Sequence, residues 1–280
     1  FNKDVSTWNV QYVNSLARMF KGAAAFNQNL GTWNVAEVTT MREIFSGATS
    51  FDGELAGWNV KNVKDFGYMF YNAAAFNQPM ASFNTSLAEN MDHMFAGAEL
   101  FDQNINTWTS VMNVNNMDSM FFNARKFNSP LFLWVPQVVT TMRKMFQNSN
   151  FNQALTAWAS DSAYGGSVST VLDMESMFEN TNFNQNIENW DVSSVRNFKR
   201  MFMSTPFNQD ISSWPVDSGE KFDYMFRLNY VFAHKDALDA SWPTINPQTS
   251  FYPGKHMWGK VVHENICNYA SNYVGSSTCI

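Results

Sequence analysis

The chain has 280 residues, of which 45% are hydrophobic and 15% are charged, and its formal net charge is −6. The apolar share is sufficient for a packed core, while the charged share lies well below the usual quarter of a globular protein. An acidic balance without a run of basic residues excludes the clustered positive surface that nucleic-acid binding requires.

An internal repeat of about 25 residues organises residues 1–231 into nine units. Each unit begins with a Phe that is followed by Asn or Asp, has an aromatic residue seven positions later, and ends near a Met-Phe or Ile-Phe pair. The opening residues are Phe1, Phe26, Phe51, Phe76, Phe101, Phe127, Phe151, Phe183 and Phe207. The unit is therefore the building block of the fold, and residues 232–280 form a separate C-terminal segment.

Within a unit, the first half is too short for a helix and predicts an extended segment between turns. In the second half, the apolar residues of 38–45 fall at i, i+3, i+6 and i+7, which predicts a short helix. The Gly47-Ala48 pair that follows suits the left-handed residue at a helix C-terminus. Each unit then supplies one short strand and one short helix.

One such unit cannot fold alone. Its large apolar residues contribute about 2 kcal/mol each, whereas ordering the backbone costs about 1–2 kcal/mol per residue. Stacking of neighbouring units must supply the rest, so we predict an α/β solenoid of strand-plus-helix coils with a non-repeating C-terminal cap. Parallel strands about 4.8 Å apart would give nine coils a stack about 40 Å long.

Two columns of repeated residues have a structural interpretation. The Asn or Asp after each opening Phe is expected to bond backbone groups at turns or to form ladders between coils. The aromatic column, which is Trp in every unit except the fourth with Phe83, is expected to be core. A row of exposed rings that stack on sugars is the alternative for this column.

The pattern FNQxLxxWxVxxVxxMxxMFxxAxx runs through all nine units and is clearest in Phe26–Ser50. It resembles the bacterial surface-protein repeat of about 25 residues first noted in mycoplasma lipoproteins, a relative of the BspA-like leucine-rich repeats. The resemblance implies a leucine-rich-repeat-like stack and an extracellular or cell-surface location. It also implies a structural or adhesive role.

Two units depart from the pattern. The fourth carries the sequon Asn84-Thr85-Ser86, so Asn84 would be a glycosylation site in a secreted eukaryotic chain. The seventh carries an insertion at 161–168 with a flexible tip. Such insertions form loops that often contact partners, although neutral drift at a tolerant site explains them equally well. The candidate partner residues are Asp161, Tyr164, Gly165 and Gly166.

The segment 232–280 is expected to cap the last coil or to reach the first coil of a neighbouring copy. Because Phe1 enters the repeat in register, the chain is expected to be a processed or trimmed product, and its first coil to lack a cap. Cys267 and Cys279 are expected to form a disulfide in an oxidising compartment, with free thiols as the alternative. Cys267 with the nearby histidines matches no zinc template, so no metal is expected.

The sequence contains no nucleophile elbow, no phosphate-binding glycine loop and no zinc-protease motif. Its longest apolar run, 130–136, is too short to span a bilayer. We therefore predict a non-enzymatic extracellular or cell-surface structural or adhesive protein without a cofactor, which stacks head-to-tail into filaments. Its partners would be other copies of itself, another surface protein or glycans. The alternative is a carbohydrate- or protein-binding module that uses the strand face or the 161–168 loop.

Overall fold

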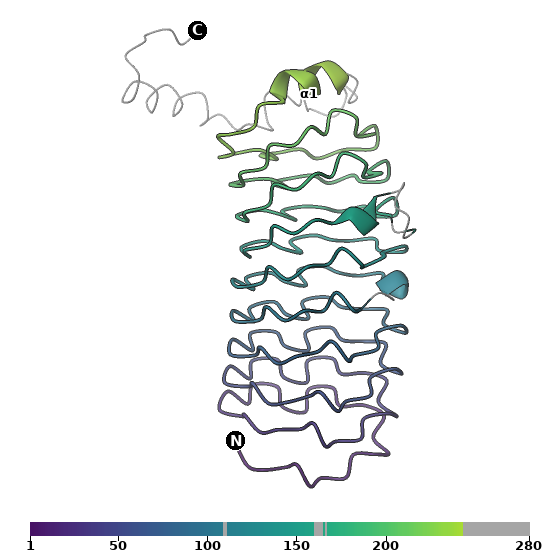
Figure 1. Cartoon of the computed structure of the whole chain (residues 1–280), viewed down its shortest axis with the longest axis vertical. Helices are drawn as coiled ribbons and strands as arrows, with labels where there is room; N and C mark the ends of the chain where they lie inside the picture. The colour runs from purple at the N-terminus through teal and green to yellow at the C-terminus, as the bar shows by residue number, and fades with distance from the viewer. Residues whose placement is uncertain (109–110, 160–164, 166, 243–280) are drawn as a thin grey trace, which may run out of the picture.

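The computed structural model describes residues 1–108, 111–159, 165 and 167–242. The described chain winds into a stack of coils along one axis, with the N-terminus at one end and helix α1 (Lys235–Ser241) at the other (Figure 1). Equivalent residues of successive coils pair in parallel, from Ser15 with Thr40 at the start to Asn197 with Lys221 at the end. Each sequence unit thus forms one coil, and neighbouring units are neighbours in space.

Turns, rather than helices, build the second half of each coil. In residues 38–45 the N–H of Ile44 donates to the carbonyl of Met41, which closes a turn of four residues. The N–H of Met41 instead donates to Asp65 O in the next coil at 2.9 Å. The predicted helix does not form because alternate N–H groups, those of Met41, Glu43 and Phe45, donate to the next coil, whereas a helix would use them internally.

The helical elements of the described residues lie outside these turns. They are the 3₁₀ helices η1 (Val111–Asn113) and η2 (Thr156–Trp158) and the helix α1. The pairing between coils consists of isolated bridges, and the described residues contain no longer strand. The assignment of the chain to the α/β solenoid class stays a prediction.

Two residues of each coil have a left-handed backbone: the residue before the Met-Phe pair and the second residue after it. Glycine occupies the second position only at Gly22, Gly47 and Gly97. At the first position the coils carry Arg, Glu, Tyr, His, Ser or Lys. A left-handed conformation costs such residues about 1–2 kcal/mol, so the bonds between coils must hold the turn in place.

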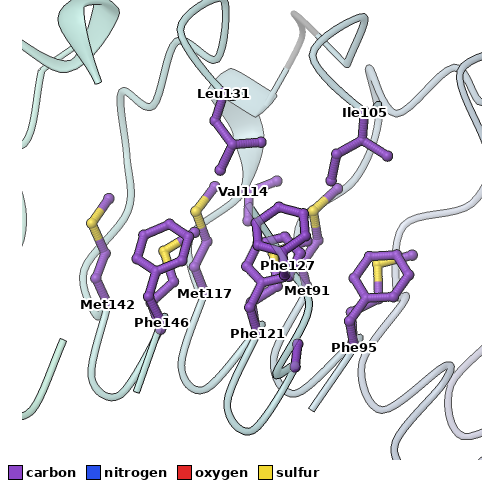
Figure 2. Close-up of a cluster of buried hydrophobic side chains, with 14 of the residues drawn as sticks. Met91, Phe95, Ile105, Val114, Met117, Phe121, Phe127, Leu131, Met142 and Phe146 are labelled. Carbon is purple, nitrogen blue, oxygen red and sulfur yellow. The ribbon is translucent and has the colours of Figure 1, made fainter. Parts of the chain in front are cut away.

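Stacked aromatic rings form the centre of the core. In the first eight units, the Phe that ends the Met-Phe or Ile-Phe pair stacks on the opening Phe of the next unit at 3.8 to 4.1 Å between ring centroids. Figure 2 shows Phe95, Phe121 and Phe146 in successive coils, next to the buried methionines. One hydrophobic cluster extends from Val5 to Trp242. The apolar stripe is therefore buried as predicted, although its backbone differs.

Helix α1 packs on the last coil. Leu238 and Trp242 are buried in the same cluster as the coils, and the Trp242 ring lies 6.0 Å from Phe222. The described part of the C-terminal segment therefore covers apolar surface of the ninth coil. No helix in the described ranges is long and apolar enough to cross a membrane.

Candidate interaction surface

The Asn or Asp after each opening Phe forms a continuous ladder. Its side-chain Oδ1 accepts a hydrogen bond from the backbone N–H of the equivalent residue in the next coil, at 2.7 to 3.0 Å. The ladder starts at Asn2 and ends where Asn208 accepts from the N–H of Ala233. This confirms the structural role predicted for the column, since each side chain satisfies a backbone donor of its neighbour.

The tryptophan column is core. Trp58 and Trp108 are almost fully buried, and each indole N–H donates to a backbone carbonyl of the preceding coil, Leu30 O at 2.8 Å and Met80 O at 3.0 Å. Trp8, on the first coil, is half exposed. The core interpretation is therefore confirmed for the inner coils, where no ring face is free to stack on a sugar.

The residues proposed from the sequence as sites fall in different places. The Asn84 side chain is exposed, and its Oδ1 accepts from the N–H of Ser86 at 3.0 Å, while Thr85 is buried. Gly165 is exposed with a left-handed backbone (φ 71°), and its carbonyl accepts from the Gln137 side chain. Glycosylation of Asn84 and partner binding by the 161–168 loop stay predictions.

The other residues of the candidate loop and the disulfide lie outside the described residues. They are Asp161, Tyr164, Gly166, Cys267 and Cys279.

A charged surface that the sequence patterns did not single out follows the turns. We call it the turn ridge and define it as the two residues before each Met-Phe or Ile-Phe pair and the one after it. In the first coils, Arg18 Nε donates to Glu43 Oε1 at 2.8 Å, and Lys21 pairs with the same carboxylate. Further along, Arg143 Nε donates to Asp118 Oδ2 at 2.9 Å. These arginines are neutralised by a carboxylate of an adjacent coil.

Arg42 crosses one whole coil to reach its partner. Its Nη1 donates to Asp92 Oδ1 at 3.0 Å, and it lies 3.5 Å from Asp65 Oδ1. The crossing is open because the coil between them has Gly67 on the ridge, where a Cβ would clash with Arg42 Nη1 and Asp92 Oδ1. The glycine is therefore needed for space rather than for its backbone conformation.

The same cluster lowers the pKa of Asp92. Burial raises this pKa, but contacts with His93, Arg42 and Asn90 favour the carboxylate and outweigh burial. Asn90 Nδ2 donates to Asp92 Oδ1 at 2.7 Å. Tyr68 lies over the Arg42 guanidinium at 5.0 Å and stacks on the His93 ring at 4.3 Å. In the middle of the ridge, the Arg42 guanidinium is therefore paired with carboxylates of the neighbouring coils.

At the C-terminal end the ridge arginines have a different environment. The guanidinium carbons of Arg200 and Arg227 lie 6.0 Å and 5.2 Å from the centroid of the Tyr224 ring. Across the described residues, neither side chain forms an ion pair, and the buried Nε of each has no acceptor. This end of the ridge therefore contains two guanidinium groups without an ion-pair partner among the described residues.

The described residues contain no group of three His, Cys, Asp or Glu side chains arranged to hold a metal ion. A shallow depression of about 520 Å³ lies on the first two coils. Its lining residues are Gln11, Tyr12, Asn14, Asn34, Ala36 and Glu37. The turn ridge, rather than this depression, concentrates the charged side chains of the described chain.

The family model described as Mycoplasma protein of unknown function, DUF285, matches residues 1–108, 76–167 and 162–252. The three matches together cover the nine coils and the start of the C-terminal segment. No curated protein and no solved structure matches the chain.

Proposed function

Because the chain belongs to the DUF285 family of Mycoplasma proteins of unknown function, we propose that it is a cell-surface or secreted repeat protein with a structural or adhesive role. The observation that carries this proposal is the continuity of the ladder that starts at Asn2 and ends at Ala233. In this proposal the stacked coils form a solenoid that acts as a stiff spacer, and no catalytic step is involved.

Continuity matters because it couples each coil to both neighbours. In a stack of repeats the stability comes from the interfaces between units as well as from each unit. Here every interface combines stacked rings, an Asn or Asp hydrogen bond and backbone bonds such as Phe45 N–H to Met69 O at 3.0 Å. Bending the rod would break several of these bonds at once, so we expect it to be stiff.

The outer face of the first coil supports a second part of the proposal. Phe1 is 62% exposed and Trp8 is 50% exposed, whereas the equivalent Phe26 and Trp33 are at most 2% exposed. We propose that the last coil of a second copy stacks on this face. Head-to-tail stacking of copies would bring the α1 end of one copy against it and extend the rod into a filament.

Small-angle X-ray scattering tests the structural part of this proposal. We expect a rod-like profile whose cross-section is that of one coil, while a compact, isotropic particle would contradict the proposal.

Sedimentation at increasing concentration tests the assembly part. We expect the mass of the chain to grow with concentration, and Trp8→Ala to abolish the growth. Phe132→Ala, at an exposed ring in the middle of the stack, is the matched control and should leave the growth unchanged. A single monomer mass at all concentrations would contradict assembly, but it would not contradict the proposal that the monomer is a stiff rod.

A further inference from the structure

The turn ridge pairs its arginines in one part of the molecule and leaves them free in another. Arg18, Arg42 and Arg143 each donate to a carboxylate oxygen within 3.0 Å. The buried side-chain Nε of Arg200 and that of Arg227 have no hydrogen-bond acceptor among the described residues. A guanidinium without a carboxylate still has its full charge and its donors, and this is the chemistry of an anion-binding group.

The backbone beneath these two arginines is held by bonds between coils. Arg200 N–H donates to Asp223 O at 3.0 Å, and Ser204 N–H donates to Arg227 O at 2.8 Å. Arg200 and Tyr224 occupy equivalent left-handed positions in the eighth and ninth coils. The Tyr224 ring lies beside both guanidinium groups, and such contacts between a cation and a ring restrict where the groups sit. The cluster is therefore presented by a rigid surface rather than by a loop.

The charge around the cluster is locally positive, although the whole chain is acidic. Segments 196–203 and 220–227, which include the ridge residues of the last two coils, contain more basic than acidic residues. The basic residues are Arg196, Lys199, Arg200, Lys221 and Arg227, and the acidic residues are Glu220 and Asp223. Lys199 lies 3.9 Å from Glu175 of the preceding coil, so part of its charge is balanced there. These two segments therefore carry a net positive charge, and the two arginines are part of it.

We propose that Arg200, Tyr224 and Arg227 form a binding site for the oxyanion groups, carboxylate or sulfate, of an acidic polysaccharide. The planar guanidinium matches the two oxygens of such a group, and the terminal nitrogens of both arginines supply the donors because each Nε is buried. The partly exposed Tyr224 ring, which both guanidinium groups contact, is the apolar group of the site that would contact a sugar ring. This gives the chain a ligand class in addition to the structural role of the rod.

The balance of charges favours a polysaccharide over a nucleic acid. A nucleic acid has a phosphate charge about every 1.7 Å of duplex, and its binding depends on neutralising many of them. The cluster offers two free guanidinium groups on a chain whose net charge is −6. The charges of an acidic polysaccharide are further apart than the phosphates of a nucleic acid, and its sugar rings can contact Tyr224.

The test measures binding of the immobilised chain to heparin, polygalacturonate, neutral dextran and single-stranded DNA at low and high salt. We expect binding to at least one acidic polysaccharide, weakened by salt, and no binding to dextran. The double variant Arg200→Gln/Arg227→Gln should lower the affinity about tenfold or more, which corresponds to about 1.4 kcal/mol. Tyr224→Ala should also weaken binding. Heparin alone would identify sulfate as the preferred group, and both polymers would show that any oxyanion suffices.

The matched control is Arg143→Gln paired with Arg18→Gln, which removes the same charge from ridge arginines that have carboxylate partners. We expect this control pair to bind like the unmodified chain. An equal loss in both double variants would overturn the proposal, as would binding to no acidic polysaccharide or tighter binding to DNA. Thermal unfolding and sedimentation mass should be the same for the Arg200/Arg227 variant and the unmodified chain, which separates loss of the site from failure of the fold or of rod assembly.

Discussion

Among the described residues, the arginines of the turn ridge have carboxylate partners in the first six coils but not in the last two. In the first region each arginine pairs with a carboxylate of another coil. Arg18 pairs with Glu43 one coil later, and Arg42 pairs with Asp92 two coils later. Arg143 pairs with Asp118 one coil earlier. In the last region the two arginines face Tyr224 and have no acceptor in the described structure. The coil geometry is shared, so the difference comes from which side chains the sequence places one coil apart.

This comparison separates support from binding. A charge that is paired within the stack stabilises the contact between neighbouring coils. Because it is already neutralised, it attracts an external ligand only weakly. A charge without a partner adds nothing to the stack and costs free energy if it is partly buried. We infer that the first region of the ridge serves the rod and the last region serves a ligand.

The largest expected effect tests whether the two regions share one core. Phe121→Ala in the first region and Phe202→Ala in the last each remove a fully buried ring that is stacked at 3.9 to 4.0 Å. We expect each to lower the free energy of unfolding by about 3–5 kcal/mol in urea titration. A much smaller loss for Phe202→Ala would show that the last coils are loosely packed, and the comparison would then fail.

The next effect concerns the tryptophan column. Trp108→Phe and Trp158→Phe remove similar buried area, but Trp108 Nε1 donates to Met80 O at 3.0 Å, and Trp158 Nε1 has no acceptor in the described chain. We expect Trp108→Phe to cost about 1 kcal/mol more in unfolding free energy, because it removes a buried hydrogen bond and leaves Met80 O with the Phe83 N–H as its remaining donor. Equal losses would mean that the indole hydrogen bonds contribute nothing net.

The smallest effect tests the ion pair that spans a coil. Gly67→Ala would displace Arg42 from Asp92 and should cost about 1 kcal/mol, after the small gain from replacing a glycine. Gly31→Ala is the matched control, since a Cβ there makes an ordinary contact of 3.6 Å with Glu54 O. If both variants unfold alike, the pair between Arg42 and Asp92 has no role in stability.

The difference in unfolding free energy between Gly67→Ala and the unmodified chain should depend on pH through the protonation of Asp92. Its pKa is lower in the folded chain than the ordinary 3.8, so its contribution is present above that value and is lost as the pH falls through the lowered pKa. We therefore expect the gap between Gly67→Ala and the unmodified chain to be constant near neutral pH and to close in strong acid.

The repeat was predictable from the sequence, and so was the identity of the core. The period of the opening phenylalanines indicates the coil, and the apolar positions of 38–45 are buried as expected. The backbone of that segment was not predictable, because a helix and a run of turns that bond to the next coil bury the same stripe. The left-handed residue before each Met-Phe or Ile-Phe pair gave no glycine signal either, since Arg18, Glu43 and Tyr68 occupy this position. Glycine marks the second left-handed position in three coils, as at Gly47.

The turn ridge was hidden for a related reason. Arg42 and Asp92 are 50 residues apart, and only the coil register brings them together. The free pair at Arg200 and Arg227 has no motif, because its defining property is the carboxylate that the neighbouring coils do not supply. Both the Arg42–Asp92 pair and the unpaired arginines would be found by aligning the units and comparing the charges at equivalent positions of successive coils.

Hydrogen exchange of the amides that bond between coils tests the central claim most directly. These include the N–H groups of Phe45, Phe70, Phe95, Phe121, Phe146 and Phe178, each of which donates to the next coil at 2.8 to 3.0 Å. A continuous, coupled stack predicts strong protection of all of them, with values that vary smoothly along the chain. Fast exchange in any interior coil, with protection on both sides of it, would contradict a single rod.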